Sequence, residues 1–166
     1  MTIVLTIISG GQTGADMGGL EAARTLGVET GGTAPQGWLT EDGPQELLLR
    51  GFGLVECSEP GYDARTRRNV VDSDATLLIG DYRRGGSALT YEIAMELRKP
   101  VFHVPYPTTS GETTLEVRIE EFRRWLLTHR IRVLNVAGNR ESTAPGIREF
   151  TRSFLERALA FDLRSL

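Results

Sequence analysis

The sequence predicts an α/β fold, in which a parallel sheet is covered by helices on both faces. Apolar runs alternate with segments of helical periodicity along the whole chain. The apolar runs are continuous rather than alternating, which is typical of parallel strands that are buried on both faces. The chain has 166 residues, 40% of them hydrophobic and 25% charged, as expected of a globular protein. We therefore expect a single domain over residues 1–166.

Six apolar runs are the expected strands, and the second is the weakest. They are Ile3–Ile8, Val28–Gly31, Gly53–Glu56, Thr76–Ile79, Val101–Val104 and Val133–Val136. Apolar residues at helical spacing predict helices at Gly18–Leu26, Arg65–Val71, Thr90–Leu97, Leu115–Leu127 and Ile147–Leu159. Pro145 suits the first turn of the last helix, because its missing N–H would be unpaired there anyway.

In open parallel sheets, ligands bind beyond the carboxyl ends of the strands. The segments that follow strands here are Gly10–Asp16, Gly80–Leu89, Pro105–Glu112 and Gly138–Gly146. The longest irregular stretch is Gly31–Gly43, which we interpret as a lid or a ligand-binding loop. Trp38 within it either stacks on a planar ring of a ligand or packs inside the protein.

A glycine-rich turn joins the first strand to the first helix. Exposed N–H groups at the start of a helix attract anions. The glycines fit neither the Walker A spacing nor the dinucleotide fingerprint, so a tight packing turn is the alternative interpretation. Asp16, in the first helical turn, would stabilise the helix dipole. The residues of this first predicted anion cradle are Gly10, Gly11, Gln12, Thr13 and Gly14.

A second glycine-rich loop follows the strand at Thr76–Ile79. Cations, exposed N–H groups and hydroxyls at a helix start form an anion cradle, although a solvated loop with Ser87 as its N-cap also explains them. The cradle residues are Gly85, Gly86, Ser87 and Thr90, preceded by Arg83 and Arg84. Two such loops indicate one site for a phosphate-bearing ligand.

Several charged residues between these loops are further candidates. Arg65 and Asn69 share one face of a helix at i and i+4, and we expect this pair to orient the anion. The pattern leaves open which of Arg65, Arg67, Arg68, Arg83 and Arg84 reaches the site. Glu92 lies one turn past the glycine pair, where it could act as a base, bind a ribose hydroxyl or stabilise the helix dipole.

Composition argues against several classes of protein. The net charge of −3 argues against nucleic-acid binding, and no apolar run approaches the ~20 residues of a membrane span. Because no targeting segment is visible, we expect a cytoplasmic protein. The single cysteine and two histidines lack ligand-like spacing, so we expect no protein-ligated metal. The exposed faces of the long helices could pair, and we expect a homo-oligomer.

Together these motifs resemble the family known as "putative molybdenum carrier", within the Rossmann-like group of nucleotide-binding proteins. The likeness runs from about residue 7 to residue 160. The segments that carry it are Ile8–Asp16, Gly31–Gly37, Glu41–Gly43, Arg65-Thr66 with Asn69, Asp72–Thr76, Gly85–Thr90 and Leu134–Ser142. The resemblance implies a Rossmann-like fold that binds molybdenum cofactor, a phosphorylated pterin whose dithiolene holds the metal.

The same larger group holds the "lonely guy" phosphoribohydrolases, which cleave a base from a nucleoside monophosphate. Their motif G-G-x-G-T-x-x-E is similar to Gly85–Glu92, although Ala88 and Leu89 replace the inner Gly-Thr. Arg65 stands nine residues before Asp74, which is the spacing of their catalytic arginine. This alternative makes Arg65 and Glu92 catalytic. A third reading, a nucleotide-sensing module, keeps the same site without turnover.

Overall fold

The computed structural model describes residues 6–107 and 114–160. A central sheet of five parallel strands has the order β2-β1-β9-β7-β8. The strands are β1 (Thr6–Ile8), β2 (Glu29–Gly31), β7 (Ala75–Ile79), β8 (Val101–Val104) and β9 (Val133–Gly138). β9, the last strand in the chain, lies between β1 and β7. Every residue of β7 is buried, as expected of a strand covered on both faces.

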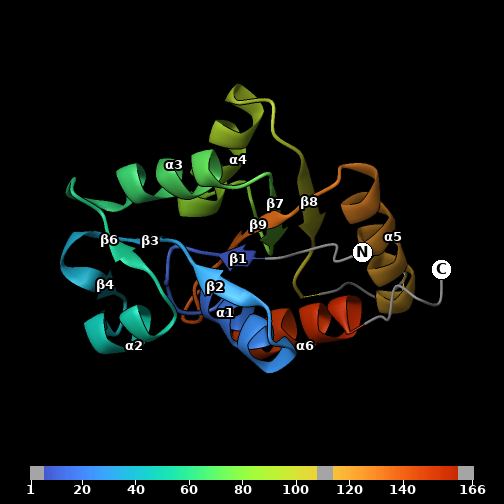
Figure 1. Ribbon diagram of the computed structural model, residues 1–166, viewed down its shortest axis with the longest axis horizontal. Coiled ribbons are helices and arrows are strands. Elements are labelled where there is room, and N and C mark those ends of the chain that lie inside the picture. The colour runs from blue at the N-terminus through green and yellow to red at the C-terminus, as the bar shows by residue number, and fades with distance from the viewer. Residues whose placement is uncertain (1–5, 108–113, 161–166) are drawn as a thin grey trace.

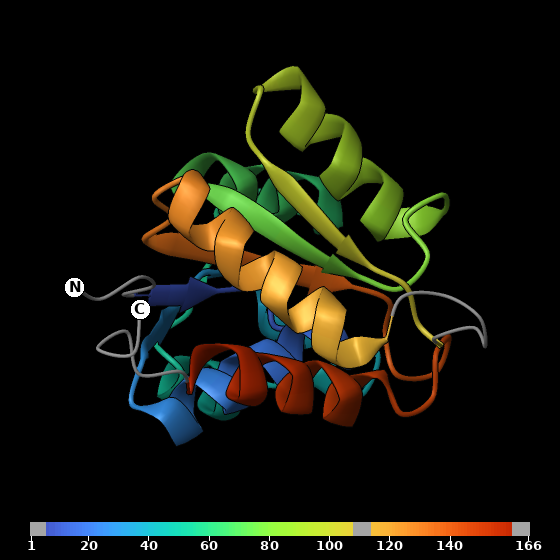
Figure 2. The same cartoon turned by 90° about the vertical axis from the view of Figure 1, so that its right-hand side faces the viewer.

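Helices cover both faces of this sheet, which confirms the predicted fold class. On one face lie α1 (Ala15–Leu26), α5 (Leu115–Thr128) and α6 (Ile147–Leu159). On the other lie α3 (Tyr62–Asp72) and α4 (Gly85–Glu96) (Figure 1). Figure 2 shows α5 and α6 in front of the sheet and α4 above and behind it.

The main hydrophobic core lies between the sheet and α1, α5 and α6. The apolar positions of α5 recur at helical spacing, so that Ile119, Phe122 and Leu126 share one buried face. Phe122 packs against Phe154 of α6 with ring centroids 5.3 Å apart. Full burial of each such side chain contributes about 1.5–3 kcal/mol, so this face fixes the positions of the strand ends.

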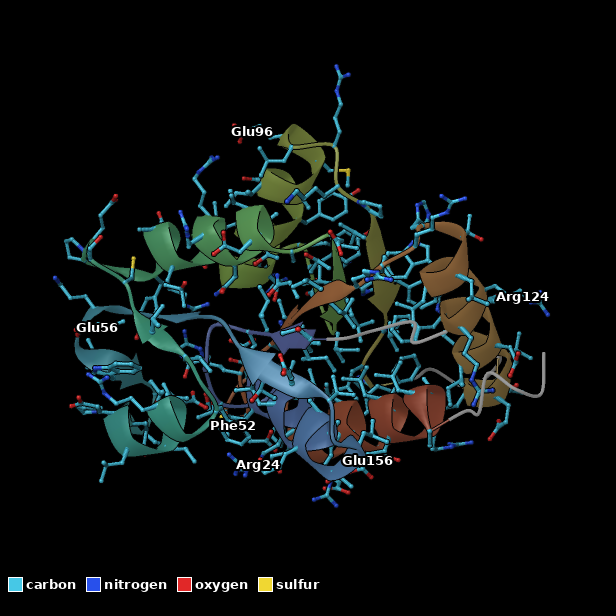
Figure 3. The ribbon with its side chains drawn as sticks, in the orientation of Figure 1. Arg24, Phe52, Glu56, Glu96, Arg124 and Glu156 are labelled. Atoms are coloured by element: carbon cyan, nitrogen blue, oxygen red, sulfur yellow. The ribbon has the colours of Figure 1, made fainter. Side chains whose placement is uncertain are left out.

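A smaller lobe occupies residues 33–56 beside α1. It consists of β3 (Thr33–Ala34), a 3₁₀ turn η1 (Gln36–Trp38), β4 (Leu39–Thr40), β5 (Gly43–Pro44), α2 (Glu46–Gly51) and β6 (Val55–Glu56). Leu49 and Phe52 pack in this lobe against Leu20 of α1. The guanidinium of Arg24 lies 3.7 Å from the centroid of the Phe52 ring (Figure 3). The lobe is thereby fixed to α1.

This lobe corrects two expectations and decides between the two alternatives for Trp38. The strand expected at Gly53–Glu56 is the two-residue β6, which pairs in parallel with β3 outside the central sheet; both of its residues are exposed, so it lacks the burial of a central strand. The stretch Gly31–Gly43 is largely built of short strands and η1 rather than a long irregular loop. Trp38 is 4% exposed within the lobe's core, so it packs inside the protein.

Other differences concern where elements begin. α1 begins at Ala15 rather than Gly18, and α4 begins at Gly85 rather than Thr90. Both glycine-rich turns therefore run directly into helices. Pro145 lies before α6, whose N-cap is Gly146, so the prediction that it occupies the first turn was wrong. Residues 3–5 of the first expected strand and residues 108–112 of the segment Pro105–Glu112 lie outside the described residues.

Candidate functional site

Three loops meet at the carboxyl edge of the sheet, because β9 pairs with both β1 and β7. They are the loops that follow β1, β7 and β9. A cavity of about 1170 Å³ opens between them and the start of α3. Its wall includes Gln12 from the first loop, Gly85 from the second and Asn139 from the third. The sequence-predicted segments thus converge on one large cavity.

The first glycine-rich turn is closed by hydrogen bonds within the protein. The Gly11 N–H donates to the Ser9 hydroxyl (3.3 Å), and the Gln12 N–H donates to the Asp16 carboxylate (3.1 Å). The Thr13 N–H donates to the Gln12 amide oxygen (3.0 Å). The Ala15 N–H donates to the Asn139 carbonyl (3.2 Å). Thr13 and Gly14 line a separate, smaller pocket of about 360 Å³. Most backbone N–H groups of this turn are therefore paired within the protein, and among its side chains those of Gln12 and Asp16 line the large cavity.

Gln12 is the side chain that this turn presents to the cavity. It is 8% exposed, and its amide oxygen accepts from the N–H groups of Thr13 and Glu41, at 3.0 and 2.9 Å. Its amide nitrogen is buried and has no hydrogen-bond partner within residues 6–107 and 114–160. Buried donors are nearly always paired in folded proteins, so this nitrogen is an exception in the wall of the cavity.

Asp16 and Arg65 form a buried, loosely paired ion pair on the cavity wall. Arg65 Nη1 lies 3.9 Å from Asp16 Oδ2, and Asp16 is 4% exposed. Burial raises the pKa of Asp16 to about 6; the charge of Arg65 and hydrogen bonds from the N–H groups of Gln12 and Gly10 oppose this shift. Burial also lowers the pKa of Arg65, and the negative charge of Asp16 opposes that shift.

Gly10 is needed because of this arginine. A Cβ atom at Gly10 would lie 2.6 Å from Arg65 Cζ. The guanidinium therefore packs directly on the glycine backbone, and the side chain of any larger residue would clash with it. Arg65 Nε is buried and has no hydrogen-bond partner among the described residues. Like the Gln12 amide nitrogen, it is a buried donor without a partner in the described part of the chain.

The second loop presents the first turn of α4 to the cavity. Gly85, Gly86 and Ser87 all line it, and the N-cap residue Arg84 makes no side-chain capping bond. The first N–H groups of a helix have no partner inside the helix. Within the described ranges, no backbone carbonyl accepts from the N–H groups of Gly85 or Gly86. Thr90 also lines the cavity, and its hydroxyl donates to the Gly86 carbonyl at 2.9 Å.

The structure separates the candidate arginines. Arg65 and Arg84 line the cavity. The other three are on the surface and pair with acids: Arg67 with Glu96 (3.0 Å), Arg68 with Asp72 (2.9 Å) and Arg83 with Asp81 (2.9 Å).

Four further candidates do not line the cavity, namely Gly10, Gly11, Asn69 and Glu92. Asn69 is 2% exposed, and its amide accepts from the Thr33 N–H (2.8 Å) and donates to the Thr33 carbonyl (3.0 Å). It therefore fixes α3 to β3. Glu92 is exposed on α4 and is not among the residues that line the cavity.

The sequence indicated the segment Gly138–Gly146 as a whole but singled out none of its residues as a site residue. The Asn139 amide accepts from the Asp81 N–H at 2.7 Å and donates to the Asp81 carbonyl at 3.0 Å, which ties the β7 and β9 loops together. Arg140 lines the cavity as well. The available signal was their position directly after a buried strand, in the segment Gly138–Gly146. Tyr106, which also lines the cavity, carried the same signal in the segment Pro105–Glu112, whereas Tyr62 carried none.

Glu41, at the tip of the β4–β5 hairpin, joins the same loops from outside the cavity. Its carboxylate accepts from the hydroxyls of Thr13 and Ser142 and from the Ser142 N–H at 3.1 Å. Partial burial alone would raise the pKa of Glu41, but the hydrogen bonds from Ser142 and Thr13 outweigh it and hold the pKa below its ordinary value. We call this arrangement the Glu41 latch.

Neither a metal-binding cluster nor a membrane-spanning helix is found among the described residues. Among residues 6–107 and 114–160, no three His, Cys, Asp or Glu side chains gather in a way that could hold a metal ion. None of the helices in these ranges has the length and apolar character that crossing a bilayer requires.

Comparisons with known proteins agree with this architecture. No curated protein sequence matches the chain significantly. A crystal structure from Syntrophus aciditrophicus SB, of a protein named "Putative molybdenum carrier protein", is 35% identical to it, with a TM-score of 0.85. The match covers 96% of this chain and 97% of that one. Residues 7–159 match the circularly permutated YpsA SLOG family. The chain therefore belongs to the circularly permutated YpsA SLOG family, and within it resembles molybdenum carrier-like proteins.

Proposed function

We propose that this protein binds a phosphorylated pterin or nucleotide in the large cavity, in a molybdenum-cofactor carrier-like role. The observation that carries the proposal is the first turn of α4. Gly85 and Gly86 line the cavity, and among the described residues no backbone carbonyl accepts from their N–H groups. The positive end of the helix and the neighbouring Arg84 favour a dianionic phosphate there.

The cavity has a second end of different chemistry. Asp16 lies in its wall beside Arg65, and a buried carboxylate repels a phosphate. We infer that the phosphate occupies the α4 end and that the uncharged ring system lies toward Gln12 and Asp16. The unpartnered amide nitrogen of Gln12 supports a polar ring edge at that end.

The name of the similar crystal structure supports a molybdenum-containing ligand, and we propose that this ligand is molybdenum cofactor. When bound, that cofactor supplies a dithiolene that holds the molybdenum, so the protein needs to hold only the pterin and its phosphate. Arg84, Gly85 and Gly86 would receive the phosphate, with Ser87 beside them. A cavity of about 1170 Å³ exceeds the volume of such a ligand.

The exposed position of Glu92 favours binding over N-glycosidic cleavage. The hydrolase alternative requires Glu92 and Arg65 to act on one substrate, yet only Arg65 lines the cavity. A nucleotide sensor would use the same contacts as a carrier. Release of free base from nucleoside monophosphates, and its loss in Glu92→Gln, would reverse this preference.

The phosphate position is tested by Arg84→Ala, with Arg83→Ala as its matched control. Arg84 lines the cavity, whereas Arg83 is paired with Asp81 outside it. Isothermal titration calorimetry with a nucleoside monophosphate should show about 10-fold weaker binding for Arg84→Ala and little change for Arg83→Ala, because one charge-assisted hydrogen bond is worth about 1.5–3 kcal/mol. Equal effects of the two variants would place the phosphate elsewhere.

The carrier role is tested by identifying the molecules that stay bound to the protein during purification. Purified from a host that makes molybdenum cofactor, the protein should retain pterin fluorescence and molybdenum in equal amounts. Native mass spectrometry should show the corresponding added mass. If nucleotides bind but neither pterin nor molybdenum is retained, the sensor is the better description.

A further inference from the structure

We propose that Asp16, Gln12 and Arg65 recognise a 2-amino-4-oxopyrimidine edge, the hydrogen-bonding edge that guanine and pterins share, and reject adenine. This inference rests on the proposed function, because it names the ring system that the cavity selects. It depends on two features of the cavity wall: a carboxylate with unused acceptor positions and two buried donors without partners.

Asp16 supplies the acceptor. An ionised carboxylate can accept about four hydrogen bonds. The carboxylate of Asp16 receives N–H donors from Gln12 and Gly10, while Arg65 stands 3.9 Å away. It therefore retains capacity for two more donors, and it lines the cavity. Two adjacent N–H groups on one planar edge match that capacity.

Gln12 and Arg65 supply the donors. The Gln12 amide nitrogen and Arg65 Nε are both buried without a partner among the described residues, and both side chains line the cavity. The orientation of the Gln12 amide is fixed, because its oxygen accepts from the N–H groups of Thr13 and Glu41. Its nitrogen therefore remains a donor and cannot exchange places with the oxygen.

The complementary ligand edge presents two N–H donors next to one carbonyl acceptor. Guanine does so with its N1–H, its exocyclic 2-amino group and O6, and a pterin does so with N3–H, its 2-amino group and O4. Adenine presents one amino donor beside the N1 lone pair, which the Asp16 carboxylate would repel. Xanthine replaces the 2-amino group by a carbonyl, which that carboxylate would also repel.

The test is calorimetric titration of the whole protein with GMP, AMP, XMP and dihydroneopterin monophosphate at pH 7.5. GMP or the pterin should bind about 10- to 100-fold more tightly than AMP and XMP, because a wrong edge leaves charged or buried groups unpaired. The ratio between GMP and the pterin identifies which of the two sources the cavity prefers.

Asp16→Asn should reverse the preference of the protein for GMP over XMP. The amide oxygen at position 16 remains with the N–H groups of Gln12 and Gly10, so the amide nitrogen faces the ligand as a donor. That donor suits the xanthine 2-carbonyl and opposes the guanine 2-amino group, so XMP should bind more tightly than GMP by about 10-fold. Gln12→Glu is a second variant that keeps the oxygen for Thr13 and Glu41 but replaces the donor by an anion. It should weaken GMP and the pterin by at least about 10-fold, with an unchanged circular dichroism spectrum.

The outcomes separate this inference from the proposed function. Equal affinities for GMP and AMP, with both weakened by Arg84→Ala, would overturn the edge recognition and leave the phosphate site standing. Failure of all four monophosphates to bind would overturn both. If Asp16→Asn does not fold, unchanged GMP affinity in Gln12→Glu would still contradict the inference.

Discussion

A glycine is required at position 10 because of where the side chain of Arg65 lies. Gly10 does not adopt a positive φ, so its backbone would accept alanine. The constraint is the guanidinium of Arg65, whose Cζ would lie 2.6 Å from an added Cβ. Sequence reasoning assigned Gly10 to a backbone anion cradle, because a glycine-rich turn before a helix predicts that role. A contact between residues so far apart in the chain cannot be predicted from the pattern.

Gly10→Ala should therefore displace Arg65 without breaking the turn. We expect ligand affinity to fall about 10-fold, through loss of a charge-assisted contact, and the free energy of unfolding to fall by about 1–3 kcal/mol from overpacking. Calorimetry with GMP and chemical denaturation measure the two effects. Gly51→Ala is the control, since a Cβ there meets no atom within 4 Å; full GMP affinity in Gly10→Ala would contradict the role of Arg65.

The ionisation of Asp16 gives a second prediction at this scale. Its pKa is raised to about 6 by burial, against an unfolded value near 3.9. Between these values the folded state binds more protons than the unfolded state, so this group makes the protein more stable as the pH falls from 7 to 4. The difference amounts to on the order of 3 kcal/mol.

Denaturation of wild type and Asp16→Asn at pH 5 and pH 7.5 isolates this group. The wild type should lose more stability than the variant on going to pH 7.5, since only the wild type must keep a buried carboxylate ionised beside Arg65 and Arg140. A ligand that donates hydrogen bonds to the Asp16 carboxylate should lower the pKa of Asp16. It should thereby reduce the difference in pH-dependent stability between the wild type and the variant. Parallel pH profiles of the two proteins would show that Asp16 does not titrate in this range.

At the scale of elements, the Glu41 latch holds together three loops that are far apart in the sequence. Glu41 contacts Thr13 of the β1 loop and Ser142 of the β9 loop. Its N–H also holds the Gln12 amide oxygen at 2.9 Å. The latch therefore orients both the turn that carries Gln12 and the loop that carries Asn139 and Arg140. A small hairpin outside the central sheet thus supports the cavity wall.

Glu41→Gln should lower the free energy of unfolding by about 1–2 kcal/mol, because a neutral amide accepts weaker hydrogen bonds than a carboxylate. The loss should disappear in acid: since the pKa of Glu41 is lowered, its contribution exists above its ordinary pKa and is lost as the pH falls below it. Asp42→Asn is the matched control, since Asp42 is the exposed neighbour. Identical denaturation curves for the two variants at pH 7 would rule out the latch.

Elements with strong periodicity were predictable, whereas short ones were not. The bounds of β8 and α6 agree with the sequence prediction, because their apolar spacing is set by the core. The small lobe was missed because its strands have two residues each and Leu47 of α2 is 90% exposed. Local patterns of that kind carry no burial signal.

At the scale of the whole molecule, the order of the strands in the sheet determines which loops form the candidate site. Insertion of β9 between β1 and β7 brings the loops of all three strands to one edge. The sequence located these loops, since each follows an apolar run. It could not predict that Asn139 would accept the Ala15 N–H on its carbonyl and thereby close the first turn. As a result, the two predicted cradles differ: one presents side chains and the other presents free N–H groups.

In the proposed complex a phosphate binds at the first turn of α4 while a ring edge meets Gln12 and Asp16. The decisive measurement is a crystal structure of the complex with the tighter-binding monophosphate. We expect phosphate oxygens within hydrogen-bonding distance of the Gly85 and Gly86 N–H groups and the ring edge on the Asp16 carboxylate. A phosphate beside Asp16, or one bound outside the large cavity, would contradict it.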